Sequence, residues 1–299
     1  SPDNISSFIS EFAVSESANI STTPKSDKLD GFGVEWDPQF FREFNTRYVS
    51  EDDWQMVIRR TKELGIQKIR VMVLPGWFEP NNDNNDPNSI NWNNLTFTTN
   101  TAFKSLIREL DVAQQLGIDV VLTLWGVDTG IWLSYPDCGD WVSAPNNPAE
   151  YAENVSILLQ YLIIKKGYSC IKELTLHNEP SWAFKTSGGN VSYSYYETVC
   201  KAVDAKLKAD GIRNKIKLCL SDDTSNNTQW FKNSVSGLAS AADSFNSHTY
   251  DFGRTTSYST VYNWALSRVS FLKSISPNKK FTINEFGGNE TVGAYHQRD

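Results

Sequence analysis

Short apolar segments alternate with longer amphipathic segments along most of the chain. Seven segments of six to eight residues are rich in β-branched and other apolar side chains, which is the pattern of parallel strands buried on both faces. Between them, apolar side chains recur at helical spacing, as in Phe103, Leu106, Ile107 and Leu110. The sequence therefore predicts strands at 31–36, 68–74, 119–125, 171–178, 216–221, 244–250 and 280–286.

Start and stop signals mark the ends of the predicted helices. Ser50 and Asp53 form a capping-box pattern, and Asn147 followed by Pro148 has the order of an N-cap and a first-turn proline. A glycine follows the last apolar position of several of these segments, as at Gly117. The expected helices span 50–65, 103–117, 147–167, 199–211, 228–240 and 257–274.

Strand–helix alternation at this spacing predicts a parallel sheet with right-handed crossovers. Two architectures compete, an open doubly wound sheet and a closed (β/α)8 TIM barrel. The first turn, from Gly33 to Pro38, is not the glycine-rich phosphate loop that usually opens a doubly wound sheet. Polar and aromatic residues instead stand at the ends of all seven strands, and a barrel gathers such residues in one mouth. We therefore expect an α/β chain with the TIM-barrel fold.

Two of these strand ends carry a glutamate. Glu179 follows the fourth predicted strand and Glu285 lies at the end of the seventh, so both carboxylates are expected at the mouth of the barrel. Cleavage of a glycosidic bond uses such a pair, because one group protonates the leaving oxygen while the other stays ionised and attacks the anomeric carbon. Different surroundings would hold the two pKa values apart. Taken alone, either glutamate is equally compatible with a structural ion pair.

An ordered set of residues around these glutamates resembles the clan A glycoside hydrolases. Both the strands that carry these residues and their order along the chain are typical of that clan. The residues are Arg70, Asn178-Glu179-Pro180, His248-Thr249-Tyr250 and Glu285. Family 5, which includes cellulases and mannanases, is the most similar group, and family 39 is a second possibility. The resemblance implies a retaining hydrolase of β-glycosidic bonds that acts by double displacement without metal or cofactor.

The resemblance also implies a role for each residue of the set. Glu179 resembles the acid/base and Glu285 the nucleophile, and double displacement requires carboxyl groups about 5–5.5 Å apart.

The other members would bind substrate or orient the carboxylates. Asn178 would hydrogen-bond the sugar 2-hydroxyl, and Arg70 would hold Glu285 ionised. Tyr250 would donate to Glu285 and orient it, and His248 would line the sugar site or modulate the acid/base.

The chain also departs from the family pattern. Trp125-Gly126 stand where family 5 commonly has a histidine after strand three, which adds a stacking face. An asparagine-rich insertion at 81–94 follows strand two, and it is either a cleft wall or a loop without a role. Further candidates for binding sugar hydroxyls or stacking on sugar rings stand near the ends of strands one and three: Glu35, Asp37, Trp36 and Trp125.

Composition favours a carbohydrate substrate and argues against other ligand classes. The 35 Asp plus Glu outnumber the 28 Lys plus Arg and give a net charge of −7, which argues against a nucleic-acid or anionic-membrane partner. No apolar run is long enough to span a bilayer. Ten Trp suggest flat stacking surfaces, for which sugar rings are one partner, while extra core volume explains about half of them. The four cysteines lack metal-type spacing, and Cys219 is expected to be a buried thiol.

The ends of the chain carry separate expectations. The chain begins at Ser1 without a methionine or leader and is rich in Asn, Ser and Thr, so a secreted or extracytoplasmic protein is expected. Residues 1–30 are expected to be an N-terminal extension, and 31–299 the catalytic barrel. Because only seven strands can be counted, the eighth strand–helix unit is expected from a second polypeptide piece. Residues 1–30 are the runner-up for filling that place.

Two other functions stay open at the level of sequence. A catalytically silent barrel that binds glycans would keep the tryptophans but normally lose one carboxylate. A metal-dependent hydrolase would use His177, His248, Asp222 and Asp223, although strand one lacks the His-x-His that such barrels usually supply. The sequence leaves the substrate open among glucan, mannan, xylan and smaller glycosides, and it leaves endo or exo action open.

Overall fold

The computed structural model describes residues 31–38, 49–139, 141–224, 226–250 and 258–287. Apart from Gly31, all of them belong to one unit, Phe32–Asp299. The expected N-terminal extension at 1–30 lies outside the described residues.

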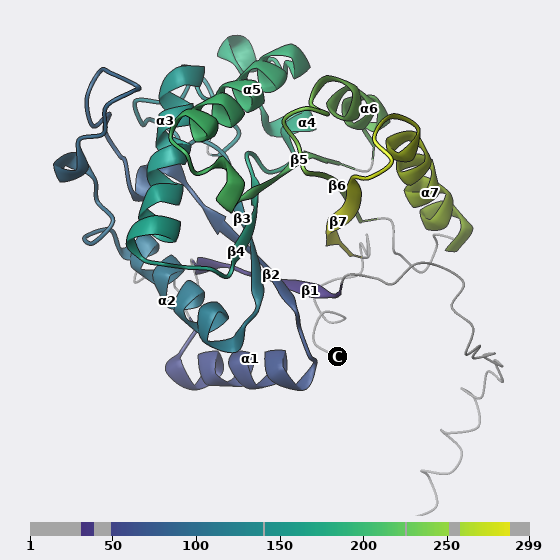
Figure 1. Cartoon of the computed structure of the whole chain (residues 1–299), viewed down its shortest axis with the longest axis horizontal. Coiled ribbons are helices and arrows are strands. Elements are labelled where there is room, and N and C mark those ends of the chain that lie inside the picture. Colours follow the sequence, from purple (N-terminus) through teal and green to yellow (C-terminus); the bar gives the residue numbers. More distant parts are fainter. Residues whose placement is uncertain (1–30, 39–48, 140, 225, 251–257, 288–299) are drawn as a thin grey trace, which may run out of the picture. The chain divides into compact units, whose positions relative to one another are not determined.

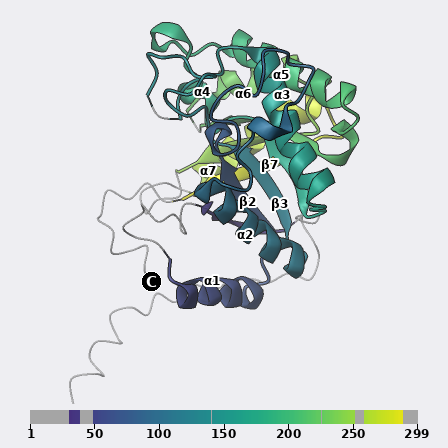
Figure 2. The same cartoon turned by 90° about the vertical axis from the view of Figure 1, so that its left-hand side faces the viewer.

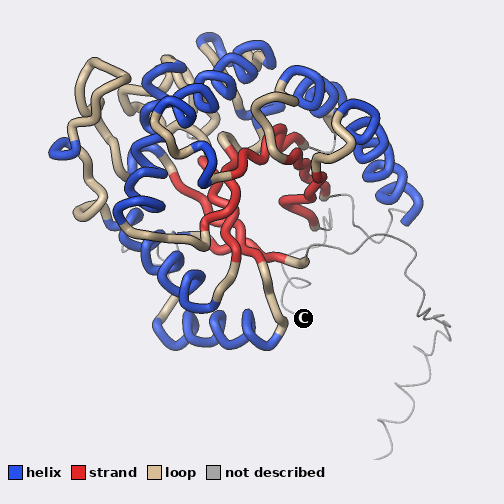
Figure 3. Tube along the Cα trace, viewed as in Figure 1, coloured by secondary structure: helices blue, strands red, loops and turns tan. Residues whose placement is uncertain are grey.

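Seven parallel strands form one sheet whose order follows the chain from β1 to β7. The sheet curls into a half-barrel, and the helices lie on its outer side (Figures 1 and 3). This arrangement confirms the predicted barrel class. The strands are β1 (Gly33–Trp36), β2 (Lys68–Val73), β3 (Asp119–Leu124), β4 (Ile171–Thr175), β5 (Lys217–Asp223), β6 (Ser244–Thr249) and β7 (Lys280–Phe286).

Every predicted helix is present, with ends that differ by a few residues. Helix α1 begins with the predicted capping box, in which the Ser50 side chain accepts from the Asp53 N–H and the Asp53 carboxylate accepts from the Ser50 N–H. A short helix that the sequence did not predict, α4 (Pro180–Ala183), follows Glu179. The others are α1 (Glu51–Glu63), α2 (Thr101–Leu116), α3 (Pro148–Leu159, continued by a π-helical segment, Gln160–Lys165), α5 (Tyr193–Ala209), α6 (Thr228–Gly237) and α7 (Tyr258–Ile275).

Alternation along the strands separates a polar interior from an apolar layer beneath the helices. On β1, Trp36 faces outward and packs edge-on against Trp54 of α1, with ring centroids 5.0 Å apart. Its neighbour Glu35 lies on the opposite face, as the period of two requires, and is in register with Arg70 of β2. Figure 2 shows the helices beside the sheet from a second direction.

Shifts in register near the ends of β5 and β6 change the direction of polar side chains. The β5–β6 ladder shifts between Ser221 and Asp223, which makes Asp222 the extra residue of a bulge. The β6–β7 ladder shifts just before His248 and pairs that residue with Glu285. Both irregularities lie at the carboxyl ends of the strands, where a barrel places its site.

Two compositional expectations can be compared with this structure. All four cysteines are buried free thiols, which confirms the buried Cys219. Among the described helices, none combines the length and the apolar character needed to cross a membrane.

Strands β1 and β7 form the two ends of the strand order. Among the described residues, β1 pairs with β2 and β7 pairs with β6. Most of the exposed large hydrophobic side chains belong to these two strands and their helices, or adjoin them: Phe32, Val34, Met56, Leu64, Tyr262, Leu266, Ile275 and Phe286. Unpaired strand edges and gathered apolar side chains are features that proteins normally cover.

We propose that a further strand–helix unit on additional polypeptide covers these side chains and pairs with β1 and β7. Active material should therefore contain more polypeptide than the 33.8 kDa of this chain, either in a longer chain or in a companion. Intact-mass analysis under native conditions measures this directly. A single 33.8 kDa species with full activity would contradict the proposal and point to residues 1–30 instead.

Candidate active site

The guanidinium of Arg70 joins four strand ends inside the barrel. Its Nη1 lies 2.5 Å from Glu285 Oε1 and 3.2 Å from Glu35 Oε2. Its Nη2 lies 2.7 Å from Asn178 Oδ1 and 3.1 Å from Asp222 Oδ2. Only 5% of Arg70 is exposed, and the surrounding carboxylates raise its pKa although burial opposes this. The structure thus brings together three of the residues that the sequence singled out from separate strands, with Arg70 as their shared partner.

Asp222 also belongs to this cluster, although the sequence offered it only as a metal ligand. Its side chain is fully buried and lies 3.0 Å from His248 Nε2, and it accepts a 2.6 Å hydrogen bond from Asn246 Nδ2. Its backbone adopts φ 47°, in the left-handed region, and the Asn246 Oδ1 accepts from its N–H at 2.7 Å. Burial alone would raise the pKa of Asp222, but His248 and Arg70 lower it, so the carboxylate is ionised.

His248 links Asp222 to both glutamates. Its Nδ1 lies 3.1 Å from Glu179 Oε1 and 3.4 Å from Glu285 Oε2, and its Nε2 faces Asp222. Burial alone would lower the pKa of His248, but Asp222 and Glu179 raise it to about 10. At neutral pH the ring is therefore an imidazolium that donates from both nitrogens.

Glu179 is held in an unusual backbone conformation at the start of α4. Its φ of 46° and ψ of 51° lie in the left-handed region, which few residues other than glycine adopt. The indole Nε1 of Trp182 donates to its Oε2 at 2.5 Å, while His248 faces its Oε1. Burial alone would raise the pKa of Glu179, but these two donors lower it. These donors do not produce the raised pKa that an acid requires, because both favour the charged form.

Glu285 is fixed from both sides. Arg70 contacts its Oε1, and the Tyr250 hydroxyl donates to its Oε2 at 2.6 Å. Burial and the nearby carboxylate raise the pKa of Tyr250, which keeps the phenol protonated as a donor. One oxygen of Glu285 and one of Glu179 lie within 4.8 Å of each other. A nearest-oxygen approach of this size is compatible with carboxyl groups about 5–5.5 Å apart, the separation in retaining glycosidases.

The two tryptophans proposed as sugar platforms lie in different places. Trp36 is 2% exposed and packs under α1, so its position does not support stacking on a sugar. The reason is the alternation of β1, which turns Glu35 inward and Trp36 outward. Trp125 is half-buried, and the Arg70 guanidinium lies 5.1 Å from the centre of its ring, so it borders the charged cluster.

A second pair of tryptophans lies beside Glu179. Trp141 and Trp182 are 38% and 40% exposed and meet edge to face, with ring centroids 6.0 Å apart. Both follow strand ends in the sequence, but the sequence alone gives no reason to connect Trp141 with Glu179. The sequence did contain one signal for the contact between Trp182 and Glu179. Trp182 lies three residues after Glu179, and one helical turn brings residues at that spacing together.

Glu35 and Asp37 border the same cluster with more exposure. The side chain of Glu35 is 36% exposed, and burial raises its pKa although Arg70 opposes the rise. Asp37 is half-buried and close enough for its charge to add to that rise. Both positions are compatible with contacts to sugar hydroxyls.

The residues present do not fit a metal centre. Of the described residues, one group of three offers ligand atoms within 4.8 Å of one another, namely Glu179, His248 and Glu285. A charged imidazolium and the adjacent Arg70 repel a cation there, since histidine binds metals only when neutral. The expected metal set is also divided: Asp223 pairs with Arg268 at 2.9 Å, and buried His177 lies 3.1 Å from the Ala183 carbonyl.

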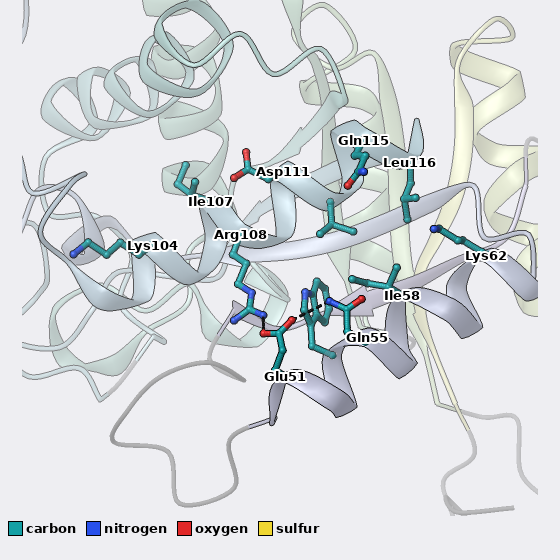
Figure 4. A pocket seen from close by; sticks show the side chains of 12 residues that line it. Glu51, Gln55, Ile58, Lys62, Lys104, Ile107, Arg108, Asp111, Gln115 and Leu116 are labelled. Carbon is teal, nitrogen blue, oxygen red and sulfur yellow. Dashed lines mark hydrogen bonds and ion pairs between the residues drawn. The ribbon is translucent and has the colours of Figure 1, made fainter.

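A hollow of about 500 Å³ lies elsewhere, between α1 and α2 (Figure 4). The side chains that line it include Ile58 and Ile107, and an ion pair between Glu51 and Arg108 spans it. It lies on outer helices and contains none of the strand-end residues, so it is separate from the candidate site.

Comparisons with known proteins give structural matches only. No family model matches the sequence, and no curated protein matches it either. SrfJ from Salmonella typhimurium superimposes with a TM-score of 0.61 at 15% identity, covering 91% of this chain and 59% of that protein. A family 39 glycoside hydrolase from Bacteroides cellulosilyticus WH2 gives 0.57 at 14% identity, covering 88% and 50%. An endocellulase from Pyrococcus horikoshii, solved with cellotetraose, gives 0.55 at 15% identity, covering 89% and 77%.

The chain has the fold of the clan A glycoside hydrolases. It spans 59% and 50% of the first two of these proteins, so it corresponds to part of each. At 14–15% identity the likeness shows the fold and no more. This structural likeness agrees with the resemblance to clan A glycoside hydrolases that the sequence motifs indicate.

The two described histidines should titrate at opposite ends of the pH scale. The pKa of His248 is raised to about 10, whereas burial lowers that of His177 to about 4. Nitrogen NMR of the imidazole rings at pH 7.5, assigned with His→Gln variants, should show His248 doubly protonated and His177 neutral. Because the unfolded pKa is about 6.5, the His248 imidazolium adds stability that is fully present below that pH and is lost as pH rises through about 10. A neutral His248 ring at pH 7.5 would refute this assignment.

Proposed function

We propose that this chain is the catalytic part of a retaining β-glycoside hydrolase that acts by double displacement. The observation that carries the proposal is the approach of Glu179 and Glu285 to within 4.8 Å of each other in one group with His248. So close an approach favours a retaining enzyme, because an inverting one needs space between its carboxyl groups for a water. The substrate is a β-linked polysaccharide, oligosaccharide or glycoside.

In the first step Glu285 attacks the anomeric carbon. Arg70 and Tyr250 hold its carboxylate in a fixed orientation, so little reorganisation is needed at the moment of attack. Glu179 gives a proton to the leaving oxygen. Asn178 accepts from Arg70 through Oδ1, so its Nδ2 is the group that donates to the sugar 2-hydroxyl.

In the second step Glu179 takes a proton from water, and that water attacks the glycosyl ester on Glu285. The donors from His248 and Trp182 suit this step, because they stabilise the ionised form that acts as a base. The same donors oppose the acid role in the first step. We therefore expect the acid form of Glu179 in the free enzyme only on the acidic side of neutral pH.

The tryptophan pair supports a saccharide on the leaving-group side. Trp182 contacts the proposed acid/base directly, so a sugar stacked on the exposed faces of Trp182 and Trp141 would lie next to the departing oxygen. We propose a secreted or extracytoplasmic location for this activity, which the Asn-, Ser- and Thr-rich composition of the chain favours.

Removing each glutamate should affect substrates differently. Glu285→Ala should reduce turnover to background on every substrate, because no other group forms the glycosyl ester. Glu179→Ala should lower kcat/KM by about 10²–10⁴-fold on glycosides with poor leaving groups and far less on activated aryl glycosides, which need little protonation.

The matched control is Glu63→Ala, which removes an exposed carboxylate on α1. This variant should leave kcat/KM unchanged on both kinds of substrate. Thermal unfolding of each variant separates loss of chemistry from loss of folding. Equal losses in both active-site variants on all substrates would show that the roles are wrongly assigned.

Trp182 should tune the pH dependence through its N–H group. Trp182→Phe keeps an aromatic face but removes the donor to Glu179, which raises the pKa of that carboxyl. The first step needs the protonated acid, so the alkaline limb of the kcat/KM profile should move to higher pH. Trp141→Phe keeps the Trp182 donor and should leave that limb in place. An unmoved limb in Trp182→Phe would contradict the assignment of Glu179.

A further inference from the structure

Asp222 lies fully buried on the other side of the His248 ring from the two glutamates. It stands at the bulge near the end of β5, and Asn246 of β6 holds it in place. The Asn246 Oδ1 accepts from the Asp222 N–H at 2.7 Å, and the Asn246 Nδ2 donates to Asp222 Oδ1 at 2.6 Å. Because one side chain fixes both the main chain and the carboxylate, Asp222 presents its oxygen to His248 in one defined position.

That position requires a proton on Nε2 of His248. The Asp222 Oδ1 lies 3.0 Å from this nitrogen, and an ionised carboxylate can only accept. The other ring nitrogen, Nδ1, lies 3.1 Å from Glu179 Oε1 and 3.4 Å from Glu285 Oε2. When these two carboxylates are ionised they also can only accept, so Nδ1 must carry a proton as well. The geometry by itself therefore requires a doubly protonated ring.

The charges that face this ring come from four elements. They lie on β5, after β4, on β7 and on β2, and they belong to Asp222, Glu179, Glu285 and Arg70. Burial and Arg70 oppose a charge on the ring, whereas Asp222 and Glu179 raise the pKa of His248 to about 10, with Asp222 contributing most. Asp222 also lies 3.1 Å from Arg70 Nη2, so its removal would leave the guanidinium less balanced beside the ring.

The single N–H at Nδ1 faces two acceptors whose charges alternate during double displacement. In the first step Glu179 is protonated and Glu285 is a carboxylate, whereas in the second step Glu285 is esterified and Glu179 acts as the base. The N–H can therefore follow the negative charge from one glutamate to the other while the ring stays in place. As Glu179 gives its proton to the leaving oxygen, the same N–H stabilises the carboxylate that forms.

We propose that Asp222 is a positioning residue that keeps His248 doubly protonated through both steps, so that one N–H serves Glu285 and Glu179 in turn. This role rests on the proposed double displacement. Both ring protons stay on the ring, and the proton that Glu179 gives to the leaving oxygen is restored when Glu179 takes one from water. The arrangement also explains how Glu179 acts as an acid, because the His248 donor turns to Glu285 while Glu179 is protonated.

Nitrogen NMR of the imidazole rings at pH 7.5 tests which carboxylate keeps the ring charged. Glu179→Gln and Glu285→Gln should each leave His248 doubly protonated, because Asp222 remains in both variants. Asp222→Asn should leave the ring neutral, because its strongest partner is lost while burial and Arg70 still oppose the charge. The glycosyl ester should also break down about 10–100-fold more slowly in Asp222→Asn, which is the loss expected for one hydrogen bond to a charged group.

Asp223→Asn is the matched control for removing a buried carboxylate from β5. Asp223 has no exposed surface and pairs with Arg268 at 2.9 Å, so this variant should leave the His248 ring charged. Thermal unfolding shows whether each variant is folded. If Asp222→Asn does not fold, Glu179→Gln still decides the question, since a neutral ring in that variant would show that Glu179 rather than Asp222 maintains the charge.

Labelling of Glu285 with a fluorinated glycoside separates this role from the proposed function. A labelled Glu285 together with a neutral His248 in the wild type would overturn the role of Asp222 and leave the proposed function standing. A ring that Glu179→Gln neutralises and Asp222→Asn leaves charged would do the same. A charged ring without any label on Glu285 would overturn the proposed function and, with it, the alternating use of the N–H.

Discussion

The buried charge of Arg70 is the constraint on which the mouth of the barrel depends. A guanidinium inside a protein needs partners in fixed positions, and removing one side of such an arrangement typically costs about 3–5 kcal/mol. Here the partners come from β1, from the segment after β4, from β5 and from β7, as Glu35, Asn178, Asp222 and Glu285. The register of strands far apart in sequence is thus tied to one side chain. That side chain also contacts the proposed nucleophile, Glu285, and fixes the position of its carboxylate.

The same charges account for the unusual backbone at two positions. Glu179 and Asp222 both have φ in the left-handed region, which costs of order 1–3 kcal/mol each for such residues. Each contacts His248, whose Nδ1 faces Glu179 and whose Nε2 faces Asp222. The imidazolium therefore joins the proposed acid/base to Asp222 and, through it, to Arg70. The strained backbone and the buried charges therefore belong to the same preorganised arrangement.

Periodicity predicted the fold well because buried parallel strands and amphipathic helices differ in period, and all seven strands lie where apolar runs place them. The ordered motifs likewise located Arg70, Glu179, His248 and Glu285. The sequence could not show that Trp36 faces the helices, because inward or outward orientation depends on register. It also missed Asp222 as a partner of Arg70, since a bulge turns that residue inward. The lowered pKa of Glu179 depends on donors from two other positions, His248 and Trp182, which only the folded chain brings together.

The central claim is that Glu285, held by Arg70 and Tyr250, forms a covalent ester with the sugar. The most direct measurement is to incubate the active protein with an aryl 2-deoxy-2-fluoro-β-glycoside, which slows breakdown of the ester, and to locate the label by peptide mass spectrometry. The account predicts one sugar per chain, attached to Glu285. A label on another residue, or hydrolysis that inverts the anomeric centre without any adduct, would contradict it.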